Sequence, residues 1–241
     1  LITITKQSIT RFTGTYYINH TDIYINRRNI YFKGDEMNYN NLLTFGDVIE
    51  LRLNCNVSKL LYNTKQYEWK RYNPRKDIPR YGLSVTSLDG SLNGIDLDSI
   101  AEYNKENGTS YNESSFKTFT DVYKNCYETR KLVEPFEPWL WRTHYLNFKR
   151  GGFFPPHRDM RHVGEQESFR ILVPLKCCNP PGMFFMYDGK PLHFNMGTAY
   201  FVNTNKMHSI FSYEDNAYMM VMNVECNEES LKKVGELIRW K

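Results

Sequence analysis

Short runs of β-forming residues follow one another along the second half of the chain, and apolar and polar positions alternate within them. Turn signals such as Gly151-Gly152 and Asp188-Gly189 separate the runs, which recur at roughly 8- to 12-residue intervals. The runs are Trp141–Phe148, Phe154–Asp159, Phe169–Leu175, Met183–Tyr187, Pro191–Asn195, Thr198–Asn203, Met207–Phe211 and Tyr218–Val224. This spacing is typical of a sandwich or barrel, and a jelly roll of two Greek keys fits it best.

The first part of the chain mixes strand and helix patterns. Residues 1–35 contain short alternating runs broken by turns, and the last of these turns is Lys33-Gly34-Asp35. From Phe45 to about Tyr62 the spacing of apolar residues predicts a helix, with Asp47 as its N-cap. The apolar positions are Val48, Leu51, Cys55, Leu60 and Leu61. We expect this helix to pack on the outside of the later sheet.

Further segments extend these patterns. Trp69–Gly90 is predicted to be extended and then to form a strand, because two prolines interrupt any helix there. Residues 91–117 are polar and are interpreted as a surface loop, with a lid as the alternative. Phe119–Val133 has the pattern of a second amphipathic helix, and Asn227–Trp240 that of a capped C-terminal helix.

The predicted fold is therefore α+β, with a jelly-roll core and helices packed outside it. We expect strands and helices of the N-terminal part in residues 1–135 and the core in residues 136–226. The C-terminal helix occupies residues 227–241.

Charge and composition limit the classes of partner that the protein is expected to bind. The net charge of +4 is small, and the basic residues are interspersed with acidic ones, so no nucleic-acid partner is expected. No apolar run approaches the roughly 18 residues that span a bilayer, so no membrane partner is expected. The five cysteines include no C-x-x-C pair, which favours reduced thiols in a cytoplasmic protein.

Three polar residues of the strand-rich half have the pattern of a metal site. His157 and Asp159 are two residues apart on a predicted strand, so their side chains point to the same face. His208 lies near the start of a later strand. Two histidines and one carboxylate form the facial triad that binds non-haem Fe(II) and leaves positions open for a cosubstrate and O2. Chance polar residues at strand ends are the alternative, which the all-β surroundings make less favourable.

The other histidines carry weaker signals. His162 follows the triad pair in a predicted loop, where it would contact substrate or simply be exposed. His193 lies near a strand end and is the main competitor as a ligand, whereas His144 is interpreted as structural.

Arg170 lies inside the otherwise apolar run Phe169–Pro174. A guanidinium in such a position needs an anionic partner. A dicarboxylate cosubstrate such as 2-oxoglutarate would supply one, because the planar fork of arginine binds a carboxylate through two hydrogen bonds. An ion pair with an internal aspartate or glutamate is the alternative.

These residues together resemble a known family. Pro156-His157-x-Asp159, the run that begins at Arg170, Phe201-x-Asn203 and His208 are similar to motifs of the aspartyl/asparaginyl β-hydroxylase-like family. The resemblance covers about residues 139–225. It implies a double-stranded β-helix, the cupin-like form of the jelly roll, and an Fe(II)- and 2-oxoglutarate-dependent dioxygenase. His157, Asp159 and His208 would then bind iron, and Arg170 would contact 2-oxoglutarate.

The sequence departs from the family pattern at two points. Leu172 occupies a position that is often histidine, and Asn216-Ala217-Tyr218 lacks the second arginine that usually binds the far carboxylate of 2-oxoglutarate. We therefore expect Arg170 to bind the cosubstrate with the help of a hydroxyl group, such as that of Tyr145, with a different cosubstrate as the alternative.

The resemblance implies hydroxylation of an amino acid, peptide or protein side chain, with release of succinate and CO2. Arg142, Arg158 and His162 lie near the predicted mouth of the site and are the expected substrate contacts. A cupin-like metal enzyme that does not use 2-oxoglutarate and a non-catalytic jelly-roll binding module remain as alternatives.

Overall fold

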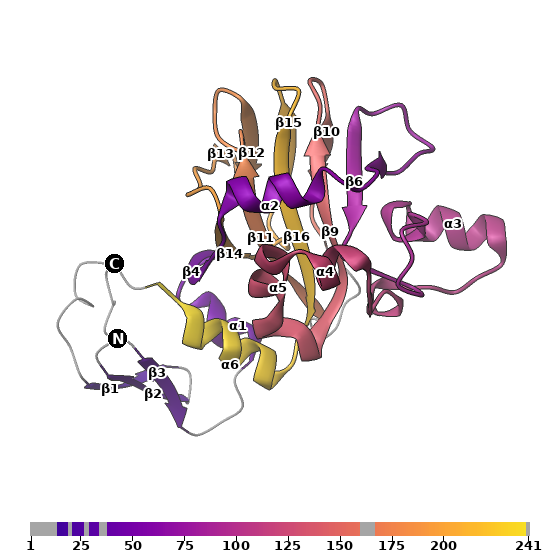
Figure 1. The fold of residues 1–241 in the computed structure, drawn as a ribbon. Coiled ribbons are helices and arrows are strands. Elements are labelled where there is room, and N and C mark those ends of the chain that lie inside the picture. Colours follow the sequence, from indigo (N-terminus) through magenta and orange to yellow (C-terminus); the bar gives the residue numbers. More distant parts are fainter. Residues whose placement is uncertain (1–13, 19–20, 27–28, 34–37, 160–166, 240–241) are drawn as a thin grey trace.

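The computed structural model describes residues 14–18, 21–26, 29–33, 38–159 and 167–239 (Figure 1). Strands from Leu140 onward form its centre. They are β9 (Leu140–Phe148), β10 (Phe153–His157), β11 (Ser168–Lys176), β12 (Met183–Tyr187), β13 (Lys190–Pro191), β14 (Thr198–Val202), β15 (His208–Ser212) and β16 (Ala217–Glu225). Seven of them correspond to predicted runs, whereas β13 shares only Pro191 with the predicted run Pro191–Asn195, whose other residues are not in a strand.

The strand order identifies the fold. Within the described residues one sheet has the order β10-β15-β12-β13, and the other contains β14-β11-β16-β9. Apart from the hairpin of β12 and β13, successive strands therefore pass back and forth between the two sheets, and their pairings are antiparallel. This is the strand order of a double-stranded β-helix, and with the flanking helices it makes the protein α+β, as predicted.

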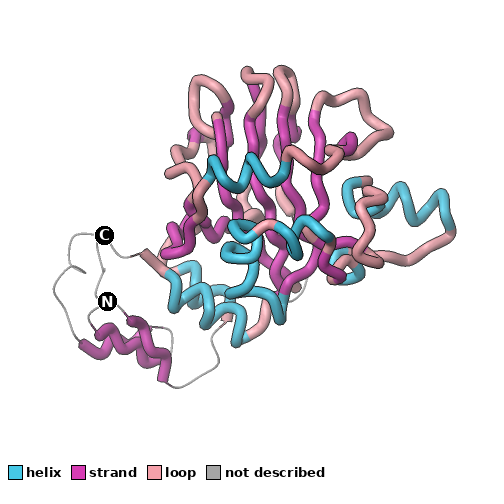
Figure 2. Tube along the Cα trace, in the orientation of Figure 1, coloured by secondary structure: helices cyan, strands magenta, loops and turns pink. Residues whose placement is uncertain are grey.

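The strands of the larger sheet are buried on both faces because their alternate residues enter two different hydrophobic clusters. On β11, Leu172 packs toward the smaller sheet, whereas Ile171 and Val173 pack toward the helices. Helix residues such as Leu60 and Leu231 complete the second cluster. The helices thus cover the outer face of the larger sheet (Figure 2). Its inner face lines a cavity.

Strands from the N-terminal part lengthen the larger sheet at both edges. At one edge, β4 (Val48–Asn54) pairs with β14. At the other, β6 (Arg80–Ser84) pairs with β9, and β5 (Lys70–Arg71) pairs with β6. Two further groups of strands are β1 (Gly14–Ile18), β2 (Thr21–Asn26) and β3 (Asn29–Lys33), and β7 (Thr86–Ser87) with β8 (Thr118–Phe119). The division at residues 135 and 226 stays a prediction.

The helix predicted from Phe45 to Tyr62 is wrong in its first half. Ile49, Leu51 and Leu53 are buried at every second position, the period of a strand, and they form β4. The helix α2 (Val57–Thr64) begins only after Asn56, whose side chain accepts a hydrogen bond from the backbone N–H of Lys59.

The remaining helices follow the sequence pattern more closely. The predicted helix at Phe119–Val133 is divided at Cys126 into α4 (Asp121–Asn125) and α5 (Tyr127–Val133). The C-terminal helix is confirmed as α6 (Glu228–Leu237), and Asn227 caps it. The other helices are α1 (Tyr39–Leu43), α3 (Ile100–Asn107) and the 3-10 turns η2 (Ile95–Leu97), η3 (Glu113–Ser115) and η4 (Glu134–Trp139). Among the described residues, every helix is too short or too polar to cross a membrane.

The polar segment 91–117 is only partly the surface loop that was expected. It contains α3, which has no buried residue in the described structure. Asp96 and Glu113, however, are buried, because they hydrogen-bond to polar groups of β6, β9 and β16. This segment therefore brings charged groups into the interior.

Candidate metal centre

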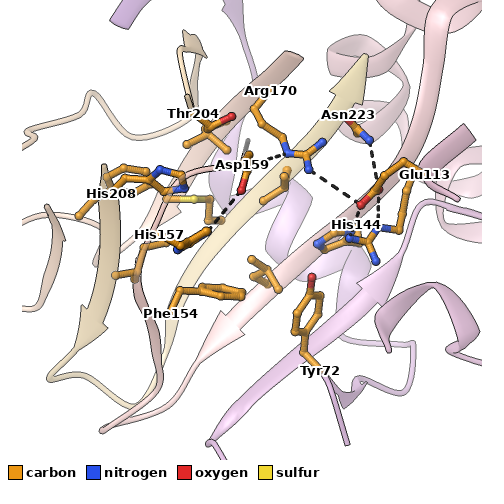
Figure 3. A pocket seen from close by; sticks show the side chains of 17 residues that line it. Tyr72, Glu113, His144, Phe154, His157, Asp159, Arg170, Thr204, His208 and Asn223 are labelled. Atoms are coloured by element: carbon orange, nitrogen blue, oxygen red, sulfur yellow. Dashed lines mark hydrogen bonds and ion pairs between the residues drawn. The ribbon is translucent and has the colours of Figure 1, made fainter. Parts of the chain in front are cut away.

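The ends of two paired strands bring His157, Asp159 and His208 together. His157 ends β10 and His208 begins β15, and the two residues are direct partners in the antiparallel register. Asp159 follows β10, where its backbone N–H donates to the carbonyl of Thr204 at 2.9 Å. One potential ligand atom from each side chain lies within 4.8 Å of the others. Figure 3 shows the three side chains converging on one point of the cavity.

Both histidine rings are oriented by the backbone. Nδ1 of His157 lies 2.7 Å from the carbonyl oxygen of Pro155, and Nδ1 of His208 lies 2.9 Å from that of Lys206. A carbonyl only accepts hydrogen bonds, so each Nδ1 carries a proton, and in the neutral form of the ring Nε2 keeps its lone pair. This is the arrangement that metal-binding histidines usually have, with one nitrogen for the metal and the other held by a hydrogen bond.

The third side chain of the triad presents a single oxygen. Oδ1 of Asp159 lies 3.4 Å from Nε2 of His157. Its Oδ2 lies 3.2 Å from Nε of Arg170. The arginine thus fixes one carboxylate oxygen and leaves the other directed at the histidines. Two imidazole nitrogens and one carboxylate oxygen form a donor set that suits Fe(II), so the residues fit the predicted metal.

Electrostatics favours the ionised carboxylate of Asp159 and the neutral ring of His208, whereas it favours a second proton on His157 that a metal would displace. Burial alone would raise the pKa of Asp159, but the hydrogen bond with His157 and the charge of Arg170 outweigh burial and lower this pKa well below its ordinary value. The hydrogen bond with Asp159 raises the pKa of His157. Burial lowers the pKa of His208, which favours its neutral form.

The triad opens into a cavity of about 200 Å³ between the two sheets. One part of its wall is polar and the other part is apolar. The polar part includes Tyr72, Glu113, His144, Arg170, Thr204 and Asn223 (Figure 3), together with Arg142. The apolar part consists of Leu146, Leu172, Phe185, Ile210, Met219 and Val221.

The polar wall is a closed ion network around Glu113. Arg142 approaches this carboxylate with Nε 2.7 Å from Oε2 and donates from its NH2 nitrogen to Oε1 at 2.8 Å. Asn223 donates to Oε2 at 3.1 Å, and Arg170 lies 3.9 Å from Oε1. Burial would lower the pKa of Arg142, but the charge of Glu113 outweighs burial and raises it. Arg142 and Glu113 therefore balance each other inside the wall, and the second arginine, Arg170, is balanced by Asp159 of the triad.

Arg170 lines the cavity, and it is paired with internal carboxylates. Its contacts with Asp159 and Glu113 correspond to the alternative left open by the sequence. Arg170 connects the triad to the ion network, and because it lines the cavity it is also the cation nearest to any ligand beside Asp159.

His144 lines the same cavity without joining the triad. It is buried on β9, and burial together with the charge of Arg142 lowers its pKa to about 3. Its ring lies 5.3 Å from that of Tyr72, centroid to centroid. The prediction that His144 is structural agrees with this packing.

Other predicted site residues are not brought to the cavity. Tyr145 is fully buried on the opposite face of β9, where its hydroxyl bonds with that of Thr129 at 2.8 Å, so the expected contact with 2-oxoglutarate is corrected. Arg158 and His193 are exposed and line neither wall. His162 lies outside the described residues.

Arg142 lies deeper than the sequence suggested. It is an interior residue in the ion pair with Glu113 rather than a side chain at the mouth. It still lines the cavity, so contact with substrate stays a prediction.

Sequence reasoning missed Glu113 and Asn223. Asn223 is a polar residue at an inward position of the apolar strand β16, the same signal that identified Arg170. Glu113 lies in a polar segment with no periodic pattern, so only its contacts reveal it.

The cavity fits the expected cosubstrate only in part. Arg170 supplies a guanidinium beside Asp159 for one carboxylate of 2-oxoglutarate. Leu172, Leu146 and Met219 line the apolar part and have no side-chain donor for the second carboxylate. The side chains of the cavity therefore fit the metal more completely than they fit 2-oxoglutarate.

Comparisons with known proteins return similar folds at low identity. The sequence matches no protein-family model and no curated protein. Among solved structures, a prolyl-4-hydroxylase from Pseudomonas putida has a TM-score of 0.40 at 10% identity and covers 77% of this chain and 95% of its own. A viral collagen prolyl hydroxylase from Paramecium Bursaria Chlorella virus-1, solved with 2OG, has a TM-score of 0.38 at 12% identity, with coverage of 74% and 94%. KdgF from Halomonas sp. has a TM-score of 0.34 at 10% identity, with coverage of 68% and 92%. The strand order and the site geometry carry the argument that follows.

Proposed function

We propose that this chain is an Fe(II)- and 2-oxoglutarate-dependent dioxygenase that hydroxylates an amino acid, a peptide or a protein side chain and releases succinate and CO2. The observation that supports this most is the convergence of two lone-pair Nε2 atoms and one carboxylate oxygen in a cavity between the sheets. Three ligands on one side of the iron leave the other positions for cosubstrate and O2.

When bound, Fe(II) supplies the redox chemistry. The residues of this chain orient the site. The carbonyls of Pro155 and Lys206 hold the histidine rings, and Arg170 holds one oxygen of Asp159. Asp159 would therefore hold the metal through its other oxygen.

The walls of the cavity have separate tasks in this proposal. Arg170 attracts a carboxylate of the cosubstrate, because its guanidinium lines the cavity beside Asp159. Leu172, Phe185 and Ile210 exclude water from the reacting groups, since their side chains are apolar and buried.

A second candidate is a metal enzyme of the same fold that does not use 2-oxoglutarate. The apolar surface formed by Leu146, Leu172 and Met219 favours it, because a second carboxylate placed there would be buried without a hydrogen-bond donor.

Anaerobic titration separates the candidates. The protein is mixed with Fe(II) and then with 2-oxoglutarate, while metal binding and the weak visible charge-transfer band of the ternary complex are followed. We expect the band and succinate formation in air, and we expect both to be lost in His157→Ala and retained in the exposed control His193→Ala.

Two other outcomes would contradict the proposal. Iron binding without a band would favour the metal enzyme that does not use 2-oxoglutarate. No uptake of iron would leave a non-catalytic binding module.

A further inference from the structure

A groove of about 350 Å³ adjoins the metal cavity. Tyr72, Phe154 and His157 line both spaces, together with Glu113 and Arg142. A molecule in the groove would therefore extend to the triad. The groove also contains residues that belong neither to the triad nor to the ion network, among them Arg80 and Lys76.

Arg80 lies in the wall of this groove, although only 4% of its surface is exposed. Its guanidinium carbon lies 4.0 Å from the ring centroid of Phe154 and 5.2 Å from that of Tyr72. One terminal nitrogen donates to the carbonyl of Phe153 at 2.7 Å. Nε is buried and has no hydrogen-bond partner. The aromatic rings thus fix the plane of a guanidinium whose hydrogen bonds are incomplete.

The other arginines of this region are paired with carboxylates, whereas Arg80 is not. Arg75 pairs with Asp98 and Glu106, and Arg142 pairs with Glu113. Among the described residues no carboxylate pairs with Arg80, and burial lowers its pKa. A buried cation without an anion is costly, so an external anion would stabilise it.

Lys76 adds a second positive charge to the groove. It is exposed, and within the described part of the chain it forms no ion pair. The acidic side chains that line the groove, Asp98 and Glu113, are already engaged by arginines. The groove therefore has unbalanced positive charge at Arg80 and Lys76.

We propose that this groove binds an anionic oxygen group of the substrate, with Arg80 as the principal partner and Lys76 at the rim. The inference rests on the proposed function, and it narrows the substrate to a molecule with a carboxylate or phosphate next to the carbon that reacts. A free amino acid or the C-terminal residue of a peptide has such a group, and the planar fork of Arg80 matches it.

The test measures binding without turnover, so it is separate from the iron titration. The full-length chain, with and without Zn(II), is titrated with N-acetylglycine, methyl phosphate or the neutral N-acetylglycinamide, while the Nε–H resonances of arginine are followed by NMR. We expect a saturable shift of the Arg80 resonance with at least one of the two anions and none with the amide. The anion that binds identifies the group as carboxylate or phosphate.

Variants assign the site. Binding to the variants is followed by calorimetry, because substitution of Arg80 removes its resonance. Arg80→Met should abolish the saturable binding. Arg80→Lys should keep the charge with weaker binding if the methionine variant does not fold. Lys76→Ala should weaken binding by about 2- to 5-fold, as expected for an exposed charge. Lys59→Ala is the matched control, because Lys59 is exposed on α2 and does not line the groove.

Two results would overturn the inference. One is the absence of saturable binding by both anions, or equal binding of the amide. The other is a variant of Arg80 that loses affinity for 2-oxoglutarate and keeps its affinity for both probes, because the groove would then serve the cosubstrate.

Discussion

The two polar sides of the cavity use similar charged groups in opposite ways. On the side of β10 and β15, His157 and His208 have their Nδ1 atoms held by the backbone, and their Nε2 atoms are left for a ligand. On the side of β9 and β11, Arg142 and Glu113 balance each other within the wall. The first side can bind a metal, whereas the charges of the second side pair with each other and form a closed support for the site.

Arg170 is where the two sides meet. It contacts Asp159 of the triad and Glu113 of the ion network. The geometry of the triad therefore depends on charges that do not touch the metal. The comparison leads to three predictions, which begin with the largest expected effect.

Glu113→Gln should reduce the free energy of unfolding by about 3–5 kcal/mol, because two buried arginines would lose their shared carboxylate. Urea unfolding at pH 7 measures this change. The control is Glu106→Gln, which removes the exposed partner of Arg75 and should have a far smaller effect. Equal effects of the two variants would contradict the description of the Glu113 network as a closed support.

Arg170→Met should weaken metal binding by about 10- to 100-fold, because Asp159 would lose the group that fixes its Oδ2. Titration with Fe(II) or Zn(II) under anaerobic conditions measures the affinity. Arg142→Lys serves as the control, since Arg142 contacts Glu113, Asp96 and Asp98 in the described structure rather than Asp159 and should leave the affinity nearly unchanged. Tighter binding in Arg170→Met would instead mean that the positive charge matters more than the positioning.

His144→Gln should make the protein less sensitive to acid. The pKa of His144 is about 3 in the folded protein and 6.5 in the unfolded chain, so the unfolded chain takes up a proton as the pH falls below 6.5. Between pH 7.0 and 5.5 this residue should therefore cost at most about 1.4 kcal/mol of stability. Urea unfolding at both pH values should show a smaller loss in the variant than in the wild type. The exposed control His193→Gln should resemble the wild type, and an unchanged loss in His144→Gln would refute the role of burial.

The strand-rich core was predictable because its strands carry their own signals. Turns separate the runs, and the inward positions of β11 and β16 alternate with positions that face the helices. The triad was recognisable for the same reason, since His157 and Asp159 are two apart and His208 begins a later run. Local pattern and function coincide in this part of the chain.

Other features depend on contacts between distant segments. Residues 48–55 carry two patterns: Val48, Leu51 and Cys55 have helical spacing, whereas Ile49, Leu51 and Leu53 have the period of a strand. Pairing with β14 decides in favour of the strand. Glu113 is brought to Arg142 and Asn223 by tertiary structure alone. The error at Tyr145 was avoidable, because Arg142 and Tyr145 are three residues apart and so face opposite sides of one strand.

The two prolines before His157 have a consequence for how a peptide can approach. Pro155 and Pro156 are exposed on β10, which in the described structure pairs only with β15 in its sheet. Proline has no amide hydrogen to offer, so this margin cannot accept another extended chain as an added strand. A peptide that reaches the metal site along this edge would have to be recognised by its side chains or its terminus. The same prolines also disfavour aggregation by strand pairing at this edge.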